Sequence, residues 1–176
     1  MRRITHTLLG AAVAMPTAVS HDPIIAAACL WWGMAGGGLP DWFDLRSDLR
    51  GPLRLQHRGI SHSIVFLIVV TGLVLGLFTL LRASGFALAG VHLIPPENAV
   101  VPWLVALALG IASHLASDAC THGGIRPLLP FSRARVWLLP GFLRSRFDGY
   151  LDTVFRLAAI AFIGVGSIAY VGERLS

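Results

Sequence analysis

Seven side chains that can bind a divalent cation occur in four short stretches of a largely apolar sequence. They are His6, Asp41, Asp44, His57, His62, His114 and Asp118. Imidazole nitrogens and carboxylate oxygens form a borderline-to-hard ligand set that suits zinc first, with manganese or iron(II) as alternatives. Ionisable residues are costly in apolar segments, so their presence there indicates a function. The sequence therefore predicts a site for one or more divalent metal ions.

The spacing of these residues suggests how they could meet and what they could catalyse. His114 and Asp118 are four positions apart and would share one face of a helix, as would Asp41 and Asp44 if their turn is helical. A bound divalent ion could activate water to attack a phosphoester or an ester. We expect catalytic roles for a subset of the ligands and one neighbour: Asp41, Asp44, His62, Asp118 and Arg58.

Arg58 has two interpretations. Its guanidinium, next to His57, could hold a substrate phosphate through two parallel hydrogen bonds. It could equally be one of the arginines that fix the orientation of the chain in a membrane.

Composition places these residues in an integral membrane protein. Of the 176 residues, 55% are hydrophobic and only 13% are charged, and the mean hydropathy is +0.72. This composition is foreign to a soluble domain of the same length. We expect an all-α helical bundle, one domain over residues 1–176, in a bacterial inner membrane. The net charge of +5 is by itself only weak support for a nucleic-acid partner.

Segment length predicts four to five membrane segments, since about 20 apolar residues cross a bilayer. The expected segments are Ile4–Val19, Pro23–Ala35, Ile60–Leu81, Ala99–Ser117 and Thr153–Val171. The first two are short and could form a partly inserted hairpin around residues 20–23.

The basic residues, all arginine, predict the orientation of the bundle. With five crossings and a cytoplasmic N-terminus, residues 1–3, 36–59 and 118–152 face the cytoplasm and contain eleven of the fourteen arginines. All seven candidate ligands then lie near the cytoplasmic face. His21 and His92 fall on the opposite side, so we exclude both from the site.

The N-terminal segment has an alternative interpretation as a secretory signal peptide. Arg2 and Arg3, an apolar stretch and the small residues Ala18 and Ser20 fit that pattern. Cleavage would leave the orientation of the later helices unchanged but would remove His6.

Other reactive residues receive simpler interpretations. Ser61 and Ser63 are placed to cap the helix that follows them. A serine nucleophile at Ser61 or Ser113 would require a base and an oxyanion hole for which the sequence gives no sign. Cys29 and Cys120 are separated by the predicted topology, which argues against a disulfide.

The stretch from Arg126 to Arg146 mixes arginines with large apolar side chains, as do segments that lie on a membrane surface. It could cover the site, with a phospholipid entering from the side, or it could simply anchor the loop.

Three blocks of this sequence together resemble one family. They are Thr5-His6 with Gly38-Leu-Pro-Asp41-Trp-Phe-Asp44, then His57-Arg-Gly-Ile-Ser-His62-Ser63, then Gly110-Ile-Ala-Ser-His114-Leu-Ala-Ser-Asp118-Ala-Cys-Thr121, followed by Gly123, Pro130 and Phe131. They resemble the YdjM-like, LexA-regulated membrane-bound metal-dependent hydrolases over roughly residues 1–135. The resemblance implies metal or active-site roles for the seven ligands named above. It leaves the substrate open, and His122 falls outside the site.

Two other classes of function use the same residues. A transporter could pass metal ions or protons through them, but transporters place such ligands near the bilayer midplane and often in repeated halves. A noncatalytic scaffold could use a metal ion to tie helix ends together. We expect a membrane-bound hydrolase whose partners are the lipid bilayer and a phosphoester substrate such as a phospholipid.

Overall fold

In the described part of the chain, the protein forms a bundle of five α-helices with a very short β-ribbon. The structure, a computed structural model, describes residues 1–45, 59–85, 87–88, 91–92, 95–146 and 149–175. The helices are α1 (Arg3–Ala18), α2 (Pro23–Leu45), α3 (Ile64–Ser84), α4 (Glu97–Ala119) and α5 (Tyr150–Leu175), with 3₁₀ turns η2 (Ile60–His62) and η3 (Gly141–Leu143). Strands β1 (Ala87–Leu88) and β2 (Val91–His92) pair antiparallel. The prediction of an all-α membrane bundle is confirmed.

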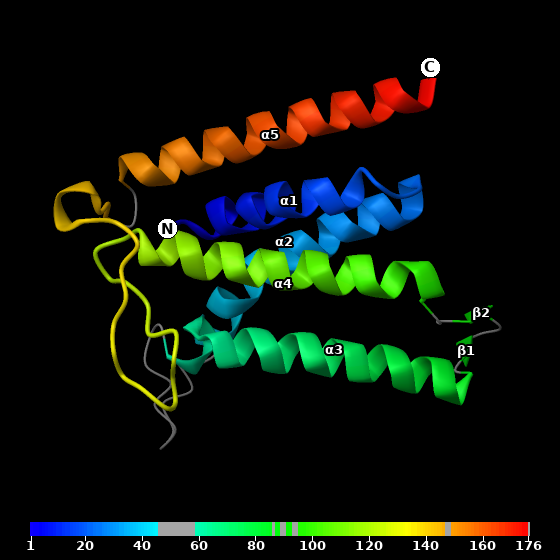
Figure 1. Ribbon diagram of the computed structural model, residues 1–176, viewed down its shortest axis with the longest axis horizontal. Helices are drawn as coiled ribbons and strands as arrows, with labels where there is room; N and C mark the ends of the chain where they lie inside the picture. The colour runs from blue at the N-terminus through cyan, green and yellow to red at the C-terminus, as the bar shows by residue number, and fades with distance from the viewer. Residues whose placement is uncertain (46–58, 86, 89–90, 93–94, 147–148, 176) are drawn as a thin grey trace.

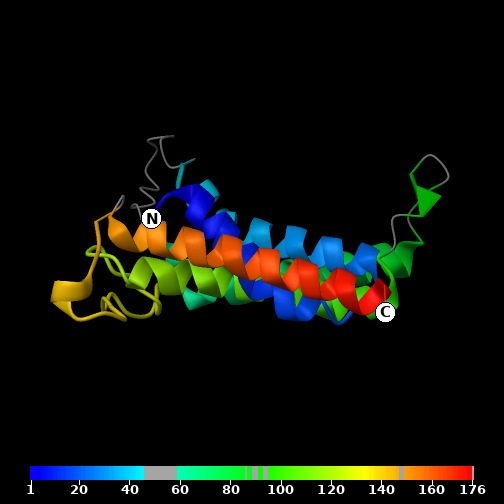
Figure 2. The same ribbon diagram turned by 90° about the horizontal axis from the view of Figure 1, so that it is seen from above.

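The helices lie side by side along one long axis (Figures 1 and 2). Helices α1, α2 and α4 all contact one another and form the core, while α5 packs on α1 and α3 packs on α4. The starts of α1, α3 and α5 and the ends of α2 and α4 share one end of the bundle, at the left of Figure 1. We call it the site end.

Glycines let the three core helices approach unusually closely. A Cβ added at Gly37 would meet the carbonyl oxygen of His6, and one added at Gly110 would meet the carbonyl oxygen of Gly33. Small residues at helix crossings are how membrane helices gain packing contacts without a hydrophobic driving force. This close packing brings the backbone of α2 within reach of side chains on α1 and α4.

The outer helices present apolar side chains outward. On α3, Leu73 is 69% exposed, and on α5, Ile168 is 75% exposed. Among the described residues, four helices are long and apolar enough to cross a membrane, namely α2, α3, α4 and α5. Helix α1 has 16 residues, about 24 Å at 1.5 Å per residue. It lies against three other helices, which shields much of its surface from lipid.

The end of α2 differs most from the boundary that the sequence predicts. Helix α2 continues ten residues past Ala35, through Gly36–Gly38 and Pro40, to Leu45. Tertiary packing overrides the weak helix propensity of these residues because their small faces are covered by α1 and α4. Asp41 and Asp44, predicted to follow the second segment, therefore lie in the last turns of α2.

The third segment begins with a 3₁₀ turn rather than with the helix itself. His62 lies in η2, and α3 starts after it at Ile64. Ser63 caps α3 as predicted, because its hydroxyl accepts a hydrogen bond from the Phe66 amide at 3.2 Å. The prediction that Ser61 is also a cap is wrong, since its hydroxyl donates to Asp44 instead.

Candidate metal centre

His114, fully buried on α4, is fixed by the backbone of α2. Its Nδ1 lies 2.8 Å from the carbonyl oxygen of Gly37. A carbonyl can only accept, so Nδ1 carries the proton and donates it. The lone pair of the imidazole is therefore on Nε2, which points into the core between the helices. The close α2–α4 crossing makes this contact possible.

His62 is held by two residues from neighbouring elements. The Ser61 hydroxyl donates to Asp44 Oδ1 at 2.7 Å, so its oxygen is left to accept from Nδ1 of His62 at 3.0 Å. The other carboxylate oxygen, Asp44 Oδ2, lies 3.6 Å from the same Nδ1. His62 thus also has its proton on Nδ1, and its Nε2 lies 3.1 Å from Nε2 of His114.

His6 on α1 follows the same pattern. The Ser117 hydroxyl donates to the carbonyl oxygen of His114 at 2.9 Å and is left to accept from Nδ1 of His6, also at 2.9 Å. The His6 ring stacks on the His114 ring with centroids 3.9 Å apart. In all three histidines, Nδ1 is oriented by an outer partner and Nε2 is left for the centre, as in metal-binding histidines.

Two carboxylates complete the cluster. Asp41 Oδ1 lies 3.6 Å from Nε2 of His62 and 3.7 Å from Nε2 of His114. Asp118 places Oδ1 3.4 Å from Nε2 of His6 and Oδ2 3.5 Å from Nε2 of His62. The amine of Met1 is also 3.4 Å from Asp118 Oδ1.

The spacing of these atoms fits a metal ion. Zinc ligands at about 2.0–2.2 Å from a tetrahedral ion are about 3.3–3.6 Å from one another. The distances from Nε2 of His62 to its neighbouring donors, 3.1–3.6 Å, fall around that range. Two groups of convergent ligand atoms result: His6 with His114 and Asp118, and Asp41 with His62 and His114. His114 belongs to both.

One side of the cluster is less buried than the others. His6, His62 and His114 are each 1% exposed or less, and Asp118 is 2% exposed. The side chain of Asp41 is 16% exposed. Among the five convergent residues, Asp41 therefore offers the main approach for water or a substrate. The whole cluster lies at the site end of the bundle, not at its middle.

The structure brings together five of the seven predicted ligands. Asp44 belongs to neither convergent group and instead orients His62 from outside. His57 and Arg58 lie outside the described residues. His21 follows α1 and His92 lies on β2, at the end of the bundle remote from the cluster, as predicted.

The other reactive residues named from the sequence belong to neither group of ligand atoms. Ser113 donates to the carbonyl oxygen of Gly110 within its own helix. Cys29 and Cys120 are both buried and free. Burial raises the pKa of the Cys120 thiol, which disfavours the thiolate that a metal would bind.

Sequence reasoning missed the residues that orient the ligands. Ser117 and the Gly37 carbonyl act on side chains from other helices, and nothing in the local sequence marks them. Asp152 was also missed. It is 2% exposed at the start of α5, and it accepts a hydrogen bond from the Arg2 amide at 2.8 Å, which fixes the start of α1 near the centre. An acidic residue at the head of an apolar segment was the available signal.

A family model described as YdjM inner membrane protein matches residues 1–172. No curated protein and no solved structure matches the chain.

Proposed function

This chain belongs to the YdjM inner membrane protein family, and from that premise we propose that it is a metal-dependent hydrolase acting on a phosphoester or ester. The observation that supports the proposal is the orientation of three buried imidazoles. Each is held through Nδ1, and the Nε2 lone pairs of His62 and His114 face each other at 3.1 Å. Two lone pairs at that distance repel unless a proton or a metal ion lies between them, and the neighbouring carboxylates of Asp41 and Asp118 favour a divalent ion.

The proposed ligands are the five convergent residues, His6, Asp41, His62, His114 and Asp118. The two oxygens of Asp118 face different histidines, His6 and His62, so this carboxylate would contribute to holding a metal ion beside either ring. Zinc suits the mixed nitrogen and oxygen donors best, with manganese or iron as alternatives. When bound, a divalent ion would polarise water toward hydroxide near neutral pH and offset the negative charge that develops on the scissile group.

The chain's own residues would supply the remaining chemistry. Asp41 is the most exposed of the five, so its carboxylate is the proposed acceptor of the proton from the attacking water. Asp44 and Ser61 keep the His62 ring oriented and its proton on Nδ1. Arg58, outside the described residues, remains the proposed contact for a substrate phosphate.

We place the centre at the cytoplasmic face. Arg2, Arg3 and the arginines of residues 126–146 lie at the site end, whereas Arg82 and Arg174 lie at the other end. The positive-inside rule then directs the site end to the cytoplasm. A centre at helix ends is level with lipid head groups, so a phospholipid is the first substrate class to test. Helix α1 stays on the mature chain in this proposal because it carries His6.

One observation favours a different function. The nearly complete burial of four ligands resembles a structural metal site, which is closed, more than a catalytic one, which keeps an open position. A noncatalytic scaffold whose metal ties α1, α2 and α4 together is therefore the second candidate.

The test is metal content followed by hydrolysis. Protein purified in a mild detergent without chelators should contain at least one zinc, manganese or iron ion per chain by mass spectrometry, and intact mass should show residues 1–20 retained. It should then hydrolyse phospholipids or model phosphodiesters, and Asp41→Asn should abolish turnover more completely than it lowers metal content. Bound metal with no turnover on any ester would favour the scaffold. A chain that binds no metal even after it is added back would exclude both.

A further inference from the structure

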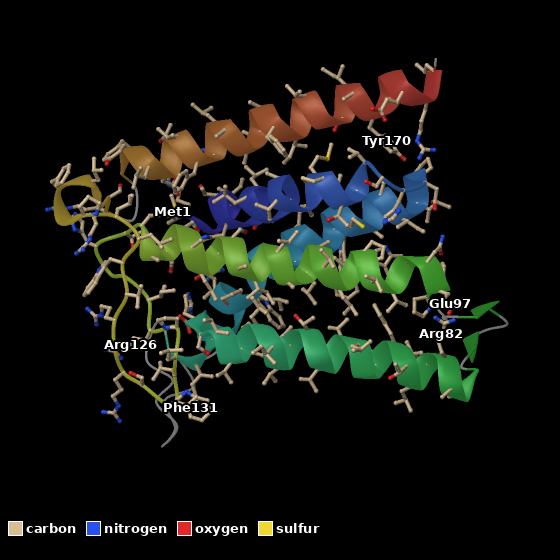
Figure 3. All side chains as sticks on the ribbon, viewed as in Figure 1. Met1, Arg82, Glu97, Arg126, Phe131 and Tyr170 are labelled. Atoms are coloured by element: carbon tan, nitrogen blue, oxygen red, sulfur yellow. The ribbon has the colours of Figure 1, made fainter. Side chains whose placement is uncertain are left out.

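The segment Arg126–Arg146, which we call the basic loop, has a well-defined fold outside the bundle. The amide of Leu138 donates to the carbonyl oxygen of Ala119 at 3.0 Å, and Ile125, just before the loop, pairs with Val136 through two backbone hydrogen bonds. The Ile64 amide donates to the Pro127 carbonyl oxygen at 2.9 Å. The loop is thereby tied to the end of α4 and the start of α3, beyond the end of the helices (Figures 1 and 3).

The basic loop exposes several large apolar side chains. Phe131 is 86% exposed and Phe142 is 85% exposed. Phe131 projects from the outer turn of the loop in Figure 3. Leu138, between them in the sequence, is 58% exposed. In water, so many exposed apolar side chains on a short and well-fixed loop would be unfavourable, which indicates an apolar surrounding.

The charge of the loop is entirely positive. No Asp or Glu occurs between Asp118 and Asp148. The guanidinium groups of Arg133 and Arg146 are exposed and have no hydrogen bond or ion pair with a described residue. Arg135 lies over the Trp137 ring at 6.0 Å. The Arg144 guanidinium lies 4.6 Å from the centroid of the same ring, and its Nε donates a hydrogen bond to the Leu139 carbonyl oxygen.

We infer that the basic loop is a binding site for anionic lipid head groups. Exposed arginines in a loop that contains no acidic residue match the charge of phosphate groups, and exposed phenylalanines in the same loop match the boundary between head groups and acyl chains. Nucleic acid would satisfy the arginines but would not account for aliphatic side chains such as Leu138. The inference does not depend on the metal centre or on hydrolysis.

The paired arginines at the other end of the bundle provide a matched control. Arg82 forms an ion pair with Glu97 at 3.2 Å, and Arg174 donates to the His21 carbonyl oxygen at 2.6 Å. Figure 3 shows Arg82 and Glu97 far from the basic loop. Replacing these two arginines changes the net charge by as much as replacing two arginines of the loop.

The experiment is native mass spectrometry of the full chain in mixed micelles that contain equal amounts of phosphatidylglycerol and phosphatidylcholine. Wild type should retain phosphatidylglycerol preferentially. Arg133→Gln with Arg135→Gln should lower that preference by about 25-fold at low salt, at roughly fivefold per basic residue. The control variant, Arg82→Gln with Arg174→Gln, should retain most of the wild-type preference for phosphatidylglycerol. Phe131→Ser with Phe142→Ser should lower retention of both lipids, because it removes only apolar contact.

Three results would overturn the inference: equal retention of both lipids by wild type, an equal loss in the control variant, or tighter binding of a 20-nucleotide RNA than of phosphatidylglycerol. Thermal unfolding of each variant checks that it is folded. The substituted side chains are exposed, so the loop variants should unfold at the wild-type temperature.

Discussion

The Nε2 atoms of His62 and His114 lie 3.1 Å apart although 52 positions separate the residues. Each ring is held on its far side by a hydrogen bond from its Nδ1. One ring donates to a backbone carbonyl across a helix crossing, and the other to a serine that is itself committed to a carboxylate. The same hydrogen bonds that orient the rings also direct their lone pairs at each other. Substitutions at these two histidines are therefore a direct test for a bound metal ion.

His114 belongs to both groups of ligand atoms, and this yields the first prediction. His114→Ala should lose more bound metal than His6→Ala, because the Nε2 lone pair of His114 lies in both groups of ligand atoms and His6 lies in only one. Metal per chain, measured by mass spectrometry, distinguishes them. His122→Ala serves as the control because His122 is exposed and outside both groups. Equal metal content in His114→Ala and His122→Ala would disprove the shared role of His114.

Asp44 should affect the metal through His62 rather than by binding it. Asp44→Asn weakens the orientation of the His62 ring, so the dissociation constant for zinc should rise about 10- to 100-fold, as for other outer partners of metal-binding histidines. Asp41→Asn should raise it further because a ligand is lost. Competition with a chromogenic chelator measures both. The same substitution at Asp22, which caps the start of α2 at the other end, should leave zinc affinity unchanged.

The close helix crossings predict which glycines can be replaced. A Cβ at Gly110 would meet the backbone of α2, so Gly110→Ala must push α2 and α4 apart, at a cost of about 1–3 kcal/mol. Gly76 on α3 has open space around it, and Gly76→Ala should be neutral or slightly stabilising because alanine favours a helix. Thermal unfolding in detergent compares the pair. Similar melting temperatures for the two variants would contradict the close crossing.

The arginine distribution predicts the sidedness of the chain. Alkaline phosphatase, which is active only outside the cytoplasm, should be active when fused after Leu175 and inactive when fused after Arg146. A cytoplasmic reporter at the same two positions should give the opposite result. Phosphatase activity at Arg146 would place the metal centre on the outer face instead.

Much of this fold was predictable because each helix is apolar along its length. The boundaries of α1 and α4 differ from the predicted ones by one or two residues, and the grouping of ligands at one end followed from counting crossings. The extension of α2 was missed because Gly36–Gly38 and Pro40 favour a turn locally. They remain helical only because neighbouring helices cover them, which is information held elsewhere in the chain.

The candidate ligands could be predicted from the sequence, but the residues that orient them could not. A histidine and a carboxylate one helical turn apart are visible in sequence, as with His114 and Asp118. The partners that orient the rings lie far away in the chain: Gly37 is 77 positions from His114, and Ser117 is 111 positions from His6. Only the three-dimensional packing shows that a glycine carbonyl and a serine hydroxyl decide which nitrogen of each ring faces the centre.

The distribution of the ligands over four segments also sets the order in which the protein can mature. His6 is made first, yet Ser117, which orients it, follows 111 residues later. At about 5–20 residues per second, that interval is on the order of ten seconds. During that time α1 must wait in the membrane with a polar imidazole and no partner from α4. The group of His6, His114 and Asp118 can therefore form only after α4 has been made, when the ribosome has completed most of the chain.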